Sequence, residues 1–170
     1  VILRAEAPGP SASKLVSKIT YTARILYGIY IVLTVVEVIM LLFSGMGIYE
    51  ATLNSFSTAG TGGFGIYGDS IAHYNSVYVE MVIASFMFIF GINFNLFYLM
   101  LMGHFLKALK SEEFLTYFFI VLIITFTTAI DLTSQTVSFS QALRFAFFQT
   151  TSIGSTTGFS TTDFTSWPQL

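Results

Sequence analysis

Three long stretches of the chain are almost entirely apolar, with few charged residues inside them. They cover residues 25–43, 77–106 and 114–130. A helix that crosses a membrane needs about 20 mostly apolar residues, because each residue adds about 1.5 Å and the hydrocarbon core is about 30 Å thick. The pattern therefore predicts three membrane-spanning helices in an all-α integral membrane protein that is surrounded by lipid.

The composition agrees with this class. Of 170 residues, 54% are hydrophobic and only 9% are charged, against about 25% charged in soluble domains. The lack of cysteine excludes a thiol nucleophile, a thiolate metal site and a disulfide scaffold. His73 and His104 are too few for a zinc centre without carboxylate ligands. No basic tract indicates a nucleic-acid partner.

Basic residues lie at one end of the predicted helices. Those that flank the first two helices are Lys14, Lys18, Arg24, Lys107 and Lys110. Because cytoplasmic loops carry an excess of Lys and Arg, we expect residues 1–24 to be a cytoplasmic linker with a basic stub, and residues 107–113 a cytoplasmic loop. The N-terminus is then cytoplasmic, and Asp69, Asp131 and Asp163 fall on the outer face.

Two segments outside these helices combine a short apolar helix with a tract rich in Gly, Ser and Thr. The first predicts a pore helix over about 48–57 and a filter tract over about 58–65. The second predicts a pore helix over about 139–151 and a filter tract over about 155–160. Non-helical backbone at membrane depth is tolerated only where it is buried in protein or lines water. Both segments are therefore expected to enter the membrane and return.

The two segments repeat with an offset of 95 residues. The aligned pairs are Ala51 and Ala146, Ser57 and Ser152, Thr61 and Thr156, and Gly63 and Gly158. The repeat divides the chain into a complete membrane–pore–membrane unit, residues 25–106, and a partial unit, residues 114–170. We expect the chain to be a fragment of a longer protein.

Tracts rich in Gly, Ser and Thr can bind a cation through their backbone. Backbone carbonyls can replace the hydration shell of a cation, and glycine lets successive carbonyls point one way because it adopts φ > 0. The C-terminal end of each pore helix adds partial negative charge. We expect eight residues to bind an ion through their backbone: Thr61, Gly62, Gly63, Phe64, Thr156, Thr157, Gly158 and Phe159. The alternative use of the small residues is close helix packing.

The motifs STAGTGGF and TTSIGSTTGFSTTDF, each behind a short re-entrant helix, resemble the Trk/Ktr/HKT potassium transporter superfamily, and in particular its TrkH-like membrane subunits. The resemblance implies four such units in one polypeptide, in a pseudo-fourfold arrangement like that of a potassium channel. This chain then corresponds to the second unit and the first part of the third. The resemblance also implies potassium uptake, with K+ held at the eight filter residues and no cofactor in this chain.

The same resemblance implies a location and partners. The location is the plasma membrane, which is the inner membrane in bacteria. The partners are the other pore units of the polypeptide, a cytoplasmic nucleotide-binding regulatory subunit and a second subunit in a homodimer.

Charged side chains within apolar segments need partners, because a lone charge at membrane depth is costly. We expect Glu37 to accept hydrogen bonds behind the filter, with ion coordination as the alternative. Glu80 is expected at the outer interface. Arg144 is expected to pair with Asp131 or Glu80. Asn93 and Asn95 cannot share one face of a helix, so at most one of them lines the pore, and hydrogen bonding between helices is the favoured role.

Two other functions stay open. An intramembrane enzyme would use Ser155 of the Gly154-Ser155 pair as a rhomboid-like nucleophile. The glycine that should follow is absent, and His73 and His104 lie too near the membrane faces to act as its base. A membrane assembly protein without transport would leave the two matched tracts unexplained. We therefore predict an ion transporter that is not an enzyme.

Overall fold

The computed structural model describes residues 12–133, 138–162 and 167, with side chains from residue 21 onward. Predictions for residues 1–11 and for Asp163 lie outside the described residues. In chain order the helices are α1 (Ala12–Phe43), α2 (Ile48–Ala59), the 3-10 helix η2 (Ser70–Tyr74), α3 (Val77–Phe90), α4 (Phe94–Leu101), α5 (Phe105–Leu109), α6 (Glu112–Thr133) and α7 (Phe139–Gly154).

Two of these helices are long and apolar enough to cross a membrane, and a bent pair can form a third crossing. The two helices are Tyr21–Phe43 of α1 and Glu112–Thr133 of α6. Both expose large apolar side chains, such as Ile31 on α1 and Ile123 on α6. Such surfaces suit a lipid environment, so the prediction of an all-helical membrane protein is confirmed.

Helix α1 begins earlier than the sequence pattern predicts. The chain is already helical from Ala12, so most of the predicted linker and basic stub is a continuation of α1. The physical reason is that no glycine or proline lies between Pro10 and Gly28, so nothing breaks the helix in this stretch.

The predicted single helix over residues 77–106 is wrong. This stretch forms α3, α4 and the start of α5, and the axes of α3 and α4 differ by 86°. Asn93 causes the new start, because its Oδ1 accepts the backbone N–H of Asn95 at 2.9 Å as an N-cap. Asn93 also donates to Glu113 of α6 at 2.9 Å, which confirms the expected hydrogen bond between helices.

The break also frees a backbone carbonyl at Phe88. The hydroxyl of Tyr117 on α6 donates a hydrogen bond to this carbonyl at 3.2 Å, and the two rings stack with centroids 5.1 Å apart. Gly91 makes the approach possible, because a Cβ there would overlap the Tyr117 hydroxyl. A side chain from a neighbouring helix thus supplies the hydrogen bond that this carbonyl loses at the break, because backbone polar groups inside a membrane need a partner within the protein.

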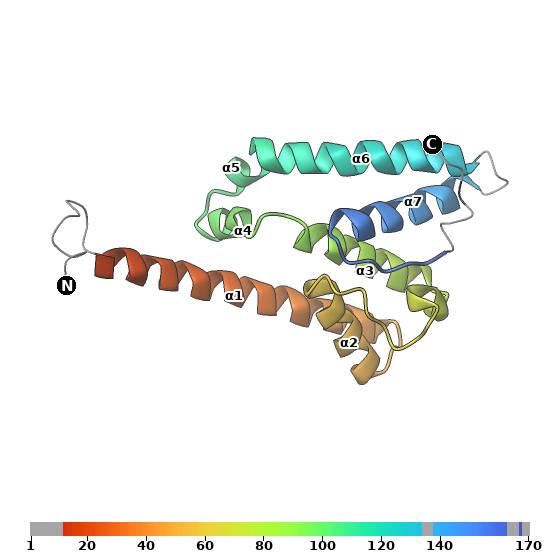
Figure 1. Cartoon of the computed structure of the whole chain (residues 1–170), viewed down its shortest axis with the longest axis horizontal. Helices are drawn as coiled ribbons and strands as arrows, with labels where there is room; N and C mark the ends of the chain where they lie inside the picture. The colour runs from red at the N-terminus through yellow and green to blue at the C-terminus, as the bar shows by residue number, and fades with distance from the viewer. Residues whose placement is uncertain (1–11, 134–137, 163–166, 168–170) are drawn as a thin grey trace, which may run out of the picture.

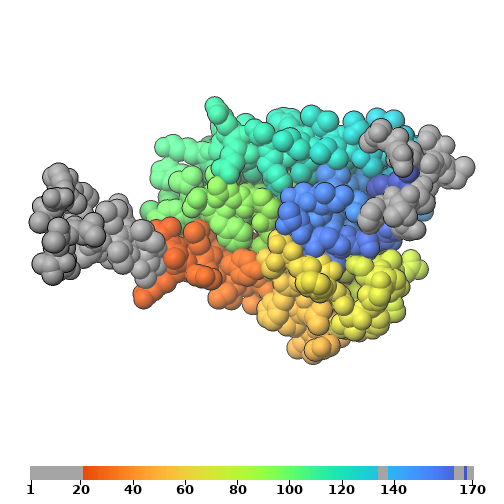
Figure 2. Space-filling model, viewed as in Figure 1, coloured from red at the N-terminus to blue at the C-terminus, as the bar shows by residue number. Residues whose placement is uncertain are grey.

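The two parts of the repeat lie side by side (Figure 1). Helix α7 packs between α3 and α6, while α2 packs against α1 and α3. Helix α3 therefore joins the two parts, since it contacts both α2 and α7. In the space-filling view, the segment after α2 (yellow) meets α7 and the segment that follows it (blue) over a continuous surface (Figure 2).

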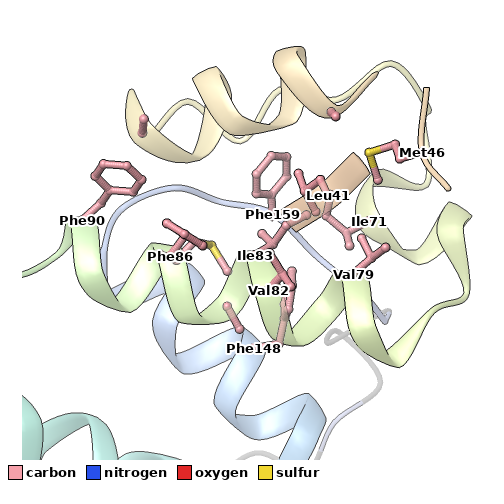
Figure 3. Packing of buried hydrophobic residues seen from close by; sticks show 14 residues of the cluster. Leu41, Met46, Ile71, Val79, Val82, Ile83, Phe86, Phe90, Phe148 and Phe159 are labelled. Atoms are coloured by element: carbon pink, nitrogen blue, oxygen red, sulfur yellow. The ribbon is translucent and has the colours of Figure 1, made fainter. Parts of the chain in front are cut away.

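The main core forms where the first pore helix, α3 and the segment after α7 meet (Figure 3). Phe159 is fully buried there at 0% exposure and lies among Leu41, Ile71 and Ile83. Phe148 of α7 joins the same cluster. The core thus contains residues from both repeats, which holds the two Gly/Thr tracts in a defined relation.

Candidate ion-binding site

Helices α2 and α7 are too short to cross a membrane and end at the Gly/Thr tracts. They have 12 and 16 residues, which correspond to roughly 18 Å and 24 Å of helix, less than the roughly 30 Å of hydrocarbon. Helix α2 packs against α1 and α3, and α7 packs against α3 and α6 (Figure 1). The partial negative charge of each C-terminal end therefore lies beside a tract.

The backbone N–H groups after each pore helix turn back to that helix. Gly62 donates to the Ser57 carbonyl at 2.8 Å, and its counterpart Thr157 donates to the Ser152 carbonyl at 2.9 Å. Two further pairs of N–H to carbonyl bonds match. Thr61 donates to Thr58 at 3.1 Å, and its counterpart Thr156 donates to Ile153 at 3.0 Å. Gly60 donates to Phe56 at 2.8 Å, and its counterpart Ser155 donates to Thr151 at 2.9 Å. The repeat predicted from side chains is therefore also a repeat of the backbone.

Left-handed conformations occur at matched positions of the two tracts. Gly63 has φ +65° and Gly158 has φ +88°, which confirms the expectation that both glycines adopt φ > 0. Thr61 at +49° and Thr156 at +62° do the same. These threonines were not predicted, because β-branched residues rarely adopt this region. Such a conformation costs of order 1–3 kcal/mol and persists where function requires it.

The residues between them, Gly62 and Thr157, do not have positive φ. Positive and ordinary φ values therefore alternate along each tract. The carbonyls of six residues accept no hydrogen bond within the described part of the chain. They belong to Thr61, Gly62, Gly63, Thr156, Thr157 and Gly158.

The two tracts touch each other. A Cβ on Gly63 would overlap the carbonyl oxygen of Thr157, so only glycine permits this approach. Further along, Ile71 donates its N–H to the Ser160 carbonyl, and Ser160 donates its N–H to Ser70 Oγ, both at 3.2 Å. The structure thus places the two sets of predicted site residues next to one another (Figure 2).

The last residue of each tract differs between the copies. Ser152 Oγ donates to the Phe159 carbonyl at 2.6 Å, and the Phe159 ring is buried in the core (Figure 3). Ser57, the counterpart of Ser152, has no hydrogen-bond partner for its buried hydroxyl among the described residues. The Phe64 ring is 79% exposed. The two tracts therefore have a similar backbone but different side-chain contacts that support it.

Arg144 forms an ion pair with Glu80. Its Nε lies 3.1 Å from Glu80 Oε2, and its guanidinium carbon lies 4.8 Å from the centre of the Phe145 ring. One of the two expected partners of Arg144 is thus confirmed. Glu80 is buried within the protein at 6% exposure, and its expected place near the outer interface of the membrane stays a prediction. The pair joins α3 to α7 and so links the two repeats.

Glu37, on α1, is fully buried. Neither carboxyl oxygen accepts a hydrogen bond from the described residues. The expectation that Glu37 accepts hydrogen bonds behind the filter stays a prediction.

Side chains of α2 and of the segment that follows the first tract form a separate polar cluster that the sequence did not reveal. Tyr67 donates to Glu50 Oε1 at 2.9 Å and stacks on His73 with ring centroids 3.5 Å apart. The hydrogen bond to Glu50 raises the pKa of Tyr67 above its ordinary value. Asn54 donates to the Tyr74 hydroxyl at 2.9 Å. These contacts join the start of α2 to the chain after the tract.

The surroundings of Ser155 do not form a catalytic triad. Its Oγ lies 2.7 Å from Thr157 Oγ1 and 3.5 Å from the Ser152 carbonyl. In the described residues no histidine or lysine is hydrogen-bonded to it, and no three His, Cys, Asp or Glu side chains gather as a metal site.

Membrane-spanning helices together with short pore helices that end in matched Gly/Thr tracts are typical of membrane transport proteins for cations. A family model described as "TrkH: Cation transport protein" matches residues 4–126. The chain belongs to the TrkH family. As expected, this is a family of transport proteins and not of enzymes.

Individual relatives agree with this assignment. The chain is 36% identical to the Trk system potassium uptake protein TrkH of Halomonas elongata, and 33% identical to that of Escherichia coli K12. Each alignment covers 98% of this chain and 35% of the relative. The crystal structure of the potassium transporter TrkH from Vibrio parahaemolyticus matches with a TM-score of 0.83 and 31% identity, over 89% of this chain and 33% of that one. The chain thus spans about a third of the length of these relatives.

Proposed function

We propose that the chain is part of a potassium uptake protein, and that residues 61–63 and 156–158 line its ion path with their carbonyls. One observation carries the proposal: the first two N–H groups of each stretch bond back to the preceding helix, while the carbonyls of residues 61–63 and 156–158 accept no hydrogen bond from the described residues. The relatives that are named potassium uptake proteins support potassium as the transported ion.

The proposed chemistry needs no charged ligand. A dehydrated cation is held by several carbonyl dipoles, whose number and field strength set the preference for K+ over Na+. The C-terminal ends of α2 and α7 add negative potential. The Phe159 carbonyl already accepts a hydrogen bond from Ser152, so Phe64 and Phe159 support the site less directly than the residues before them.

Two tracts form only half of a fourfold cage. We propose that other pore units of the same polypeptide supply the remaining sides, in a pseudo-fourfold arrangement. The division into units at residues 25–106 and 114–170 belongs to this proposal. So do the nucleotide-binding cytoplasmic subunit and the homodimer, which rest on the family resemblance alone.

The proposed orientation in the plasma membrane is testable. Asp69 and Lys110 are both exposed and are placed on opposite faces, with Lys110 and the N-terminus in the cytoplasm. Asp69→Cys in the full-length protein should react with an impermeant maleimide on intact cells, and Lys110→Cys only after lysis. Labelling of both variants from the same side would contradict the orientation.

The function is tested in a strain that lacks potassium uptake. The full-length protein should restore growth at low potassium and take up K+ in preference to Na+. A protein that inserts normally but restores neither growth nor uptake would favour the assembly role. The 170-residue chain alone should not carry K+ in liposomes, because unpaired backbone at membrane depth costs several kcal/mol per group.

A further inference from the structure

A groove runs along α7 between α3 and α6. Helix α7 packs against both of these helices and forms the floor of the groove (Figure 1), while α3 and α6 form its walls. The groove has a volume of about 690 Å³, within the range of about 300–1,000 Å³ that is usual for ligand sites. Its walls are mostly apolar and include Met81 of α3 with Leu122 and Phe126 of α6. The groove therefore suits a ligand with a large apolar part.

The two ends of the groove differ in polarity. At one end Phe88 of α3 packs against Phe118 of α6 with ring centroids 6.4 Å apart, which brings the two walls together. The other end contains Ser140 and Arg144 of α7. Arg144 pairs with Glu80, eight residues before Phe88 on α3, so about 12 Å of helix separates the two ends. The groove is thus apolar at its closed end and polar at the start of α7.

The polar end has hydrogen-bond donors that no described residue uses. A guanidinium group has five N–H donors, and Arg144 forms its ion pair with Glu80 but no hydrogen bond with the described residues. Ser138 donates its hydroxyl proton to the Gln141 side chain at 3.0 Å and does not cap the N–H groups of the first turn of α7. The start of a helix carries partial positive charge. Both features favour an anion such as a phosphate group.

Thr125 is a second unpaired polar group in the groove. It lines the groove from α6 and is 5% exposed, and its hydroxyl has no hydrogen-bond partner among the described residues. Thr127 on the same helix instead donates to the Ile123 carbonyl at 3.0 Å. Because buried hydroxyl groups are normally paired, Thr125 indicates a ligand with an acceptor oxygen between its apolar part and its anionic group.

We propose that this groove binds one membrane phospholipid. An acyl chain lies along the apolar walls toward Phe88, an ester oxygen accepts the proton of Thr125, and the phosphate contacts Arg144. A phospholipid combines these three parts in this order, whereas free phosphate would leave the apolar walls uncovered. The site lies between helices that are surrounded by lipid, and the proposal does not depend on ion transport.

The test counts the phospholipids bound to purified full-length protein by native mass spectrometry from a mild detergent. Leu122→Trp fills the groove and should carry one phospholipid fewer per subunit than the wild type. Ile123→Trp is the matched control and should carry the wild-type number, because Ile123 is 57% exposed on the same helix but does not line the groove. The double variant Glu80→Met with Arg144→Met removes the guanidinium group without leaving an unpaired charge. In a titration with dioleoylphosphatidylglycerol it should bind about tenfold more weakly, the value of one hydrogen bond to a charged group.

A second readout uses the wild type in liposomes that contain a phospholipid with a photoreactive diazirine in its acyl chain. Label on the buried Thr125 supports a lipid within the groove, and label confined to exposed residues such as Ile123 overturns the proposal. An unchanged lipid count in Leu122→Trp or an equal loss in Ile123→Trp would also overturn it. Dissociation of subunits in place of lipid loss would assign the groove to a second copy of the protein. If Leu122→Trp does not accumulate, the photolabelling of the wild type decides.

Discussion

Replacement of single glycines by alanine can distinguish residues that set the ion preference from residues that only support the fold. Gly158→Ala adds one methyl group at φ +88°, and the described residues leave space for it within 4 Å. Its cost is therefore backbone strain alone, about 1–2 kcal/mol. A loss of about 1.4 kcal/mol in ion preference is a tenfold change. We expect Gly158→Ala to lower the K+ over Na+ preference by about that factor.

Gly63→Ala should have a larger effect. Gly63 has the same left-handed conformation, and its new methyl group would also overlap the Thr157 carbonyl of the second tract. The substitution therefore disturbs both tracts at once. We expect Gly63→Ala to lower the preference for K+ by more than Gly158→Ala, at similar amounts of inserted protein.

The assay is competitive K+ and Na+ uptake by cells that express the full-length variants, normalised to membrane protein. Gly28→Ala is the control, because Gly28 lies in α1 with no positive φ and no atom within 4 Å of a new Cβ among the described residues. Gly91 is not a suitable control, since a Cβ there would overlap Tyr117. Wild-type selectivity in both filter variants, or an equal loss in Gly28→Ala, would refute the assignment of the tracts.

Three further predictions concern the scaffold. Tyr117→Phe keeps the ring stack but leaves the Phe88 carbonyl without its donor. The free energy of unfolding should therefore fall by about 1–3 kcal/mol, as measured by thermal unfolding in detergent. An unchanged melting temperature would contradict this. Arg144→Met should destabilise the protein by about 3–5 kcal/mol, and the double variant Glu80→Met with Arg144→Met should recover most of that stability. Thermal unfolding in detergent measures both variants. Additive losses would exclude an energetic coupling between the two residues. Tyr67 has a raised pKa in the folded protein, so its contribution to stability is present below the unfolded pKa near 10 and disappears as pH rises through the folded value. An ultraviolet titration against Tyr67→Phe should therefore locate its ionisation above the ordinary range, and an ordinary value would exclude the hydrogen bond to Glu50.

Features set by local chemistry were predictable from the sequence. Long apolar runs identified α1 and α6, and the matched glycines identified the positions with positive φ. A charged side chain at membrane depth requires a partner, so an ion pair of Arg144 with Asp131 or Glu80 was expected, and the structure has the pair with Glu80. In each case the physical requirement is visible in the residues themselves.

Features that depend on a distant neighbour were not predictable. The run from Val77 to Leu106 is continuously apolar, and its break becomes tolerable only because Tyr117 arrives from another helix. Thr61 and Thr156 adopt φ > 0 against their intrinsic preference. Glu37 is buried completely although it lies in an apolar run that faces lipid elsewhere, and the sequence does not show which side of the helix is covered.

Comparison of the two repeats indicates which features the proposed ion path requires. The N–H bonds and the positive φ values match in both tracts, whereas the braces behind them differ. In one copy the Ser57 hydroxyl has no partner among the described residues, whereas in the other Ser152 donates a hydrogen bond to the Phe159 carbonyl. A backbone geometry reached by two different sets of side chains points to the carbonyls as the functional groups. A single polypeptide permits this division, because each side of the cage can be braced independently while all sides present the same oxygen atoms to the ion.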